Sequence, residues 1–354
     1  MLSSAGRKAK SEKLSNEMRE DMNRLDYVSN DAALLQIQRY CLQEGKAAGT
    51  QVIRICNIAG LELHIAADRA MDIAEFRYQG TPIGYLSATG ITHPTYYEPE
   101  DYEWLRSFYG GFLTTCGLEQ VGDPCQWESE RCGLHGRVSN CPAEQVCTLV
   151  QREGDYVTGI VIGVVRQAKQ QGEAYLLRRT YQFCSDCAGF TFTDEIENQS
   201  AKPLPLQFLY HFNLGYPFLS PTLEIFLPKA TIQPVTSESE AIMETYKDSS
   251  DPRELTLLHV LQEPEPNTEI RLENGHLCLK IQFDGTRLPM LGQWRHLQPR
   301  EYVMGLEPAN THLRGVGWEE QHGTLEYLMP GEKKTYMFSV DVGVKTNGQH
   351  LHAP

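Results

Sequence analysis

The sequence has no apolar run that approaches the ~18 residues needed to cross a membrane as a helix. Basic residues are also scarce: 32 face 46 acidic ones, and the formal net charge is −14. This charge disfavours binding to nucleic acid or to an anionic membrane surface. Residues 1–13 lack the apolar core of a secretory signal. We therefore predict a cytoplasmic protein that binds neither nucleic acid nor membranes.

The usual signatures of a metal site or a disulfide framework are missing too. His64, His93 and His312 show neither HxH nor HExxH spacing, and residues 184–187 form a CxxC without a second pair at zinc-ribbon spacing. The ten cysteines are scattered, and a chain of 354 residues can fold without disulfides. We expect reduced thiols, no metal, no cofactor, and a turn at the CxxC in preference to a metal or redox site.

The sequence does contain many short strand-like segments. Apolar and polar residues alternate at residues 61–65, 190–193 and 277–283. Further β-branched or aromatic runs lie at residues 157–165, 175–183, 223–227, 302–306 and 335–342. Turn residues separate these runs and long helical patterns are few, which favours an all-β, antiparallel sandwich.

The N-terminal region has a helical pattern. Leu14, Met18, Met22 and Leu25 recur at spacings of four, four and three, which places them on one helical face. We predict a tail and short helical appendage over residues 1–30, a single β domain over residues 31–345 and a C-terminal tail over residues 346–354.

Residues 90–137 depart from the strand pattern. They are loop-rich and contain several aromatic residues and glycines. A loop this long often serves a binding site, and aromatic faces suit the C–H faces of a sugar ring. The alternative is an insertion that only packs over a sheet.

Three polar residues lie in otherwise apolar surroundings. His211 is at the centre of the aromatic run 206–216, which prolines bracket as expected for an interior strand. His135 lies between Leu134 and Gly136, and Glu307 follows the apolar run 302–306. Histidine titrates near neutral pH and can act as a general acid or base, although a buried histidine satisfied by backbone groups is the alternative. If the fold brings them together, the three form an acid–base set.

The segments around these residues resemble those of the aldose 1-epimerases, also called galactose mutarotases, and occur in the same order. The segments here are Leu134-His135-Gly136, Leu209 to Gly215 and Gly305-Leu306-Glu307-Pro308. A closer resemblance is to the DUF4432 branch of that superfamily, and it covers roughly residues 30–345. The segments that carry it are Asp68 to Ile73, Gly111 to Leu118, Leu134 to Arg137, and Leu306 to Asn310.

The resemblance implies a galactose mutarotase-like supersandwich with a carbohydrate site in an open groove. It implies that Glu307 is the base that takes the proton from the C1 hydroxyl and His211 the acid that protonates the ring oxygen. His135 matches a second histidine beside that oxygen, and Arg69 matches a substrate-binding arginine. The chain departs from the mutarotases at Tyr210, where they carry Asn, and their sugar-orienting aspartate has no clear counterpart.

Five residues are predicted to bind the substrate: Arg69, Asp72, Arg137, Trp294 and Asn310. The two arginines suit a sugar carboxylate or phosphate, and Trp294 suits a sugar face. The alternatives are a structural ion pair for Arg69, Asp72 and Arg137, and an ordinary core tryptophan for Trp294.

These observations predict a cofactor-independent sugar isomerase that interconverts the anomers of a neutral or acidic monosaccharide. One alternative is a carbohydrate-binding protein without catalysis. Another is an epimerase or isomerase that acts at a carbon next to a carbonyl, with the same acid and base. The sequence determines neither the sugar nor the oligomeric state.

Overall fold

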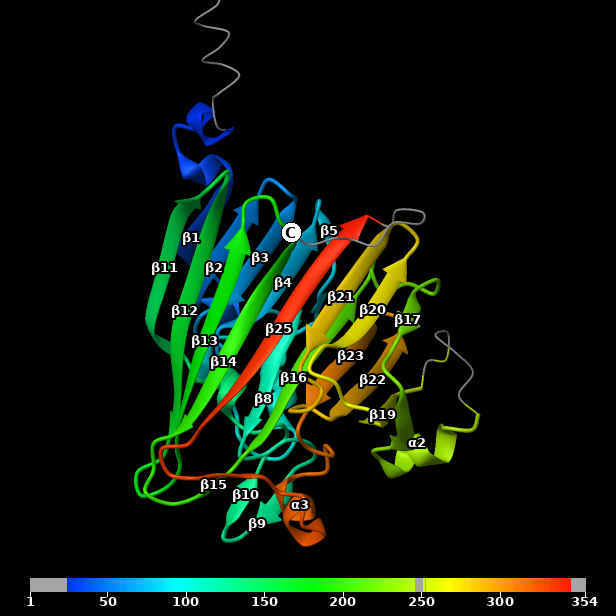
Figure 1. Ribbon diagram of the computed structural model, residues 1–354. Helices are drawn as coiled ribbons and strands as arrows, with labels where there is room; N and C mark the ends of the chain where they lie inside the picture. The colour runs from blue at the N-terminus through cyan, green and yellow to red at the C-terminus, as the bar shows by residue number, and fades with distance from the viewer. Residues whose placement is uncertain (1–23, 246–250, 252, 345–354) are drawn as a thin grey trace, which may run out of the picture.

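The structure is a computed structural model of the chain, and it describes residues 24–245, 251 and 253–344. Three antiparallel sheets of five, eight and six strands form most of the described part, with three two-stranded pairs beside them (Figure 1). The predicted all-β, antiparallel supersandwich is confirmed. Residues 14–23 of the predicted N-terminal helix and the predicted C-terminal tail lie outside the described residues.

The strands of each sheet are given in spatial order. The five-stranded sheet consists of β1 (Leu35–Cys41), β2 (Gln51–Asn57), β3 (Leu61–Ala66), β4 (Asp72–Tyr78) and β5 (Thr81–Pro82). The eight-stranded sheet consists of β11 (Ala143–Glu153), β12 (Tyr156–Ala168), β13 (Ala174–Cys184), β14 (Gly189–Asn198), β25 (Lys333–Val344), β21 (Leu277–Phe283), β20 (Thr268–Asn274) and β17 (Glu224–Phe226). The six-stranded sheet consists of β18 (Ala230–Pro234), β19 (Leu255–Leu261), β22 (Met290–Gln298), β23 (Glu301–Ala309), β16 (Gln207–Gly215) and β8 (Leu113–Leu118).

The remaining elements are short. The two-stranded pairs are β6 (Tyr85–Leu86) with β7 (Gly110–Gly111), β9 (Cys125–Trp127) with β10 (Glu130–Cys132), and β15 (Leu204–Pro205) with β24 (Tyr327–Leu328). The α-helices are α2 (Ser237–Ile242) and α3 (Val316–His322), and the 3-10 helices are η1 (Arg24–Tyr27), η2 (Asp31–Ala33), η3 (Gly45–Ala47), η4 (Pro94–Tyr96), η5 (Glu103–Ser107) and η6 (Val138–Asn140). None of the helices in the described residues is long and apolar enough to cross a membrane.

The predicted strand runs are confirmed. Residues 277–283 coincide with β21, and the run 206–216 contains β16, whose nine residues are all buried. Prolines stand outside β16 at both ends, so every residue of this interior strand keeps its backbone donor. The CxxC forms the predicted turn, because β13 ends at Cys184 and β14 begins at Gly189.

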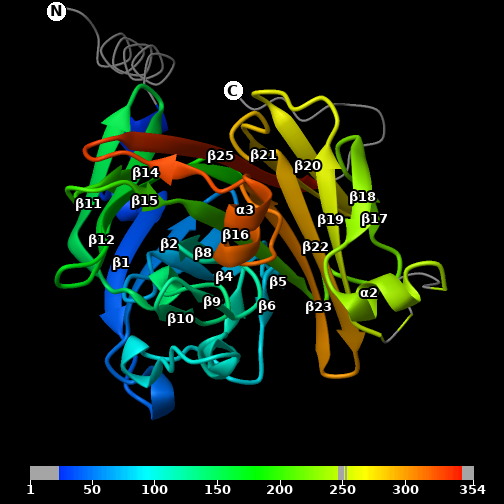
Figure 2. The same ribbon diagram turned by 90° about the horizontal axis from the view of Figure 1, so that it is seen from below.

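The six-stranded sheet has two different buried faces because successive side chains of a strand alternate. Phe208, Tyr210 and Phe212 of β16 belong to the main hydrophobic core, which contains residues of all three large sheets. Leu209 belongs to a second cluster, with Trp104 and other residues of the long loop segment. Seen from below, β9 and β10 lie on the opposite side of β16 from β25 (Figure 2). His211 therefore faces the loop-covered side of this sheet.

Arg69 anchors the loop segment that covers this face. Its guanidinium donates hydrogen bonds to the backbone carbonyls of Ser139 at 2.7 Å, Thr92 at 2.7 Å and Ser107 at 3.1 Å. The side chain is only 1 % exposed and stacks over the ring of Tyr109. Buried carbonyls outside regular structure need donors, and Arg69 supplies them. Arg69 is therefore part of the scaffold, and the prediction that it binds the substrate is not supported.

A buried ionic cluster joins the three sheets behind the loop-covered face. Arg179 of β13 contacts Asp194 of β14 through two hydrogen bonds of 2.7 and 2.6 Å and Asp72 of β4 through one of 2.7 Å. Tyr210 of β16 donates to Asp194, and Thr115 of β8 donates to Asp72 through both its amide and its hydroxyl. The three charged side chains are fully buried. Asp72 thus forms a structural ion pair with Arg179, which was the alternative to its predicted role in substrate binding.

Candidate active site

His211 and Glu307 meet on neighbouring strands of the six-stranded sheet. His211 Nε2 lies 3.2 Å from Glu307 Oε1. The residues are 4 % and 2 % exposed. They face the same side because β16 pairs with β23 in a register that sets Phe212 opposite Leu306. The acid–base pair expected from two distant sequence segments is therefore assembled by strand pairing.

Burial shifts the pKa values of this pair in opposite directions. It raises the pKa of Glu307 to about 8. It lowers the pKa of His211 to about 3, and the neighbouring His135 adds to this effect. Desolvation disfavours the charged form of either group, so at neutral pH Glu307 keeps its proton and His211 is uncharged. The 3.2 Å contact is thus between two neutral groups and is not an ion pair at rest.

Several polar atoms of this face have no protein partner. Within the described residues, His211 Nδ1, Asn213 Oδ1 and Glu307 Oε1 are buried and lack hydrogen bonds. The contact between Glu307 Oε1 and His211 Nε2 has the distance of a hydrogen bond but not its direction. Each unsatisfied buried polar group costs about 1–3 kcal/mol, so such groups point to a functional use. Hydroxyl groups of a ligand would satisfy them.

His135 completes the predicted set. Its ring centre lies 6.0 Å from that of His211. The backbone amide of Gly122 donates to His135 Nδ1 at 3.4 Å, which assigns the hydrogen of the neutral ring to Nε2. Burial lowers the pKa of His135 to about 4, so the ring is a neutral hydrogen-bond donor at neutral pH.

Aromatic rings surround the imidazole of His211. Phe108 and Trp294 lie with ring centres 5.5 and 5.7 Å from it, and Trp104 packs against both Phe108 and His135. Trp294 is partly exposed, and its Nε1 donates to Glu254 at 2.7 Å. The long loop segment thus supplies an aromatic cover, and Trp294 is a predicted binding residue that does reach the site.

Two glycines leave room for the carboxyl group of Glu307. A methyl group added at Gly292, directly opposite on β22, would lie 2.6 Å from Glu307 Oε2. One added at Gly305 would lie 2.5 Å from Oε1 and 2.8 Å from His211 Cε1. Both distances are below any normal contact, so the carboxyl group takes this position only above glycine.

We expect Gly305→Ala to reduce activity at this site by roughly 10²-fold, because displacing a reacting group by about 1 Å has an effect of that order. The added methyl group must push aside the Glu307 carboxyl group, the His211 ring or both. The measurement compares turnover and thermal unfolding with those of Gly317→Ala, whose methyl group would meet its nearest neighbour at 3.5 Å. Equal turnover in the two variants would contradict the role assigned to Gly305.

The structure does not bring the other predicted binding residues to this pair. Asn310 donates to the Leu206 carbonyl and to Glu326 and accepts from the Phe208 amide, so it fastens the start of β16. Arg137 is exposed two residues after His135. With Arg69 and Asp72 in the scaffold, the assembled set is Glu307, His211, His135 and Trp294.

Three further residues of the site were missed from the sequence. Asn213 follows His211 by two positions, so strand alternation alone would have put it on the same face. Gly305 precedes Glu307 by two positions for the same reason. Gly292 could not be identified, because its place opposite Glu307 depends on the pairing of β22 with β23.

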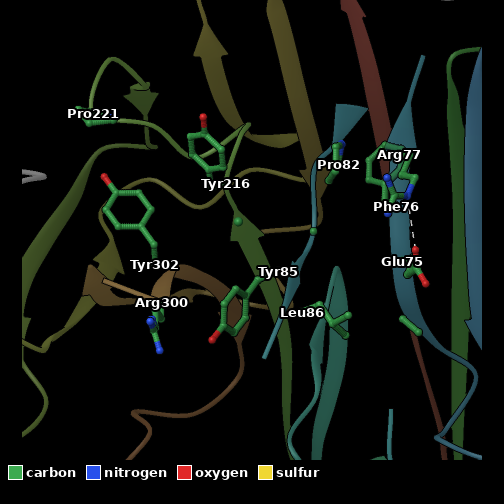
Figure 3. Close-up of a pocket in the computed structure, with 13 residues that line it drawn as sticks. Glu75, Phe76, Arg77, Pro82, Tyr85, Leu86, Tyr216, Pro221, Arg300 and Tyr302 are labelled. Carbon is green, nitrogen blue, oxygen red and sulfur yellow. Dashed lines mark hydrogen bonds and ion pairs between the residues drawn. The ribbon is translucent and has the colours of Figure 1, made fainter. Parts of the chain in front are cut away.

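A cavity of about 620 Å³ lies elsewhere. Figure 3 shows Tyr85, Tyr216 and Tyr302 on one side of it and Phe76 and Arg77 of β4 on the other. It does not include the histidines or Glu307, so the site is identified by its side chains and not by the size of a cavity. In the described residues, no three His, Cys, Asp or Glu side chains cluster so as to hold a metal ion.

Comparisons with known proteins agree with this architecture. A candidate aldose 1-epimerase from Klebsiella pneumoniae has a similar structure, with a TM-score of 0.80, 22 % identity, and coverage of 87 % of this chain and 83 % of that one. A galactose mutarotase-like protein from Clostridium acetobutylicum gives a TM-score of 0.64 at 14 % identity, covering 88 % of this chain and 99 % of that one. A galactose 1-epimerase from Lactobacillus acidophilus gives 0.57 at 12 % identity, covering 88 % and 100 %.

At such identities these likenesses establish the fold and not the activity. No curated protein matches the chain. Residues 47–342 match the sequence family described as a domain of unknown function, DUF4432. The chain therefore belongs to the DUF4432 family and has the galactose mutarotase-like fold.

Proposed function

We propose that this protein is a cofactor-independent sugar isomerase that interconverts the anomers of a monosaccharide at the His211–Glu307 pair. The observation that carries the proposal is the buried 3.2 Å contact between a carboxyl group and an imidazole whose pKa values are shifted in opposite directions. Oppositely shifted neighbouring groups are what acid–base catalysis requires. The fold shared with aldose 1-epimerases adds support by analogy.

The chemistry needs one proton acceptor and one proton donor. To open the ring, a base takes the proton of the C1 hydroxyl, the C1–O5 bond breaks, a C1 carbonyl forms, and an acid protonates O5. Rotation about C1–C2 and the reverse transfers close the ring as the other anomer. Besides the N–H of the neutral imidazole, the His211–Glu307 pair holds one transferable proton. One member of the pair can therefore donate a proton while the other accepts one at every stage. Each transfer contributes on the order of 10²–10⁴-fold.

The resemblance to mutarotases assigns the base to Glu307 and the acid to His211. In the resting pair the proton is on Glu307 instead. The assigned roles therefore require this proton to pass to His211 across the 3.2 Å contact when a polar substrate replaces the apolar surroundings. His135 would donate a hydrogen bond from its Nε2–H to O5 without transferring the proton, and Trp294 would offer an apolar face to the ring.

The loop segment must move for a substrate to reach the pair. His211 and Glu307 are almost fully covered, and Phe108 of this segment lies against the His211 ring. Opening of a cover over a buried site is common in enzymes that exclude water. Neither the sugar nor its charge follows from the assembled residues, because Arg69 and Asp72 are engaged in the scaffold.

The direct test is exchange NMR of the two anomers across a panel of neutral and acidic sugars, with and without the protein. We expect faster exchange for at least one sugar, with no deuterium entering carbon from heavy water, because only oxygen-bound protons move. Deuterium at a carbon would instead support epimerisation next to a carbonyl. Sugar binding without faster exchange on any sugar would contradict catalysis and leave a carbohydrate-binding protein.

The pKa values also predict the pH dependence. Between the pKa of His211 near 3 and that of Glu307 near 8, the pair holds its single proton. Above about pH 8 it loses this proton and has no donor left, so we expect kcat/KM to be level between about pH 3 and pH 8 and to fall above pH 8. The two apparent values belong to the pair as a whole. A rate that rises through pH 8, after subtraction of the uncatalysed reaction, would contradict this protonation state.

A further inference from the structure

The β9–β10 hairpin carries two cysteines at directly opposed positions. Cys125 begins β9, Cys132 ends β10, and the antiparallel register pairs them across the base of the hairpin. Opposed residues of an antiparallel pair have Cα atoms about 4.5–5.5 Å apart, which lies within the range that a disulfide spans. Both cysteines are free and partly exposed.

The surroundings of Cys125 favour its thiolate. The thiol of Cys132 hydrogen-bonds to Cys125 and, despite burial, lowers the pKa of Cys125 to about 6, with help from the backbone amides of Gly317 and Val316. The pKa of Cys132 is raised, because it keeps its proton in that hydrogen bond. A thiolate beside a thiol is the arrangement that begins thiol–disulfide exchange.

A short chain of hydrogen bonds leads from this thiol to the candidate active site. Cys125 Sγ contacts Gln120 Oε1 at 3.5 Å, and Gln120 Nε2 donates to the carbonyl of Gly122 at 3.3 Å. Two hydrogen bonds join Gly122 to His135. The Gly122 amide donates to His135 Nδ1, and the His135 amide donates to the Gly122 carbonyl. Figure 1 shows the hairpin beside α3, whose Val316 amide donates to the same Gln120 oxygen.

We propose that Cys125 and Cys132 form a reversible disulfide by exchange with a low-molecular-weight disulfide. The disulfide changes the hydrogen-bonded surroundings of His135. Forming the bond fixes Cys125 Sγ to Cys132, which changes its 3.5 Å contact with Gln120 Oε1, and Gln120 in turn holds Gly122. Only the consequence for catalysis rests on the proposed function. The bond and its effect on the His135 ring do not.

The reaction balances with glutathione disulfide as the oxidant. The Cys125 thiolate attacks one of its sulfurs and expels a glutathione thiolate, leaving a mixed disulfide. The Cys132 thiol then loses its proton to solvent and attacks Cys125 Sγ, expelling the second glutathione thiolate. Two protein thiols are oxidised by two electrons, and one small disulfide is reduced to two thiols.

The experiment treats the full chain with excess glutathione disulfide at neutral pH, alkylates the remaining thiols and maps the peptides by mass spectrometry. We expect Cys125 and Cys132 to be lost from the alkylated pool as one linked pair and to be restored by a dithiol reductant. Cys132→Ser should stop at a glutathione adduct on Cys125. The proposed disulfide would be contradicted if both cysteines were alkylated while the Cys184–Cys187 pair was oxidised. It would also be contradicted if the wild type ended as a glutathione adduct.

A second measurement tests the link to His135. The ring resonances of His135, assigned by their loss in His135→Asn, should shift between the reduced and oxidised wild type. They should not shift in a Cys125→Ser/Cys132→Ser double variant given the same treatment. A linked disulfide without such a shift would overturn the effect on His135. Neither measurement uses sugar turnover, so a failure of the proposed function would not be mistaken for a failure of this site.

Discussion

Replacing Glu307 with Gln is expected to reduce the anomer exchange rate by roughly 10²–10⁴-fold, because an amide neither gives nor takes a proton at neutral pH. Gln keeps the size of the side chain, so the space above Gly292 and Gly305 still accommodates it. Exchange NMR on the best substrate measures the loss. Glu301→Gln on the same strand is the matched control, since Glu301 is exposed and pairs with His296. Equal losses in the two variants, or none in either, would reject Glu307 as the acid–base group.

The same substitution has a second signature in protein stability. The folded-state pKa of Glu307, about 8, lies above the ordinary carboxyl value of about 4. Between about pH 4 and pH 8 the folded state holds a proton on Glu307 that the unfolded state has lost. The stabilisation of the folded state by this proton is therefore complete below about pH 4 and is lost as the pH rises to about 8. Gln has no proton to lose, so Glu307→Gln should become more stable relative to the wild type as the pH rises from 5 to 8. Denaturant unfolding at both pH values measures this change.

Replacing Arg179 with Met is expected to lower the free energy of unfolding by about 3–5 kcal/mol. The substitution leaves Asp72 and Asp194 fully buried without the cation that contacts both. Because the cluster joins β4, β13 and β16, the loss should also loosen the strand that carries His211. Chemical denaturation measures the effect directly.

Arg178→Met provides the matched control for this result. Arg178 precedes Arg179 on β13 but points to the opposite face and is exposed. A surface substitution of this kind usually changes stability by less than about 0.5 kcal/mol. If both variants lost stability equally, the effect would come from β13 in general and not from the buried ionic cluster.

The three candidate acid–base side chains stood out in the sequence because each is a polar group in largely apolar surroundings. His211 stands in the middle of a largely aromatic and aliphatic strand, and Glu307 stands near the end of another. Burying a polar side chain away from water costs free energy unless the side chain finds hydrogen-bond partners, whereas burying the apolar residues around it does not. Arg69 was predicted from the resemblance instead, and the sequence did not reveal the three backbone carbonyls that its buried guanidinium contacts.

The sequence by itself indicated several of the strands, among them β3, β16, β21 and β23, and which side chains along each of them share a face, because alternation along a strand is a local property of the backbone. Only the tertiary structure decided what lies opposite each strand: Gly292 across from Glu307, Arg179 between Asp72 and Asp194, and Gly122 against His135. Those neighbours depend on how strands far apart in the chain pair and stack. That choice is made by the packing of the whole core and not by any single segment.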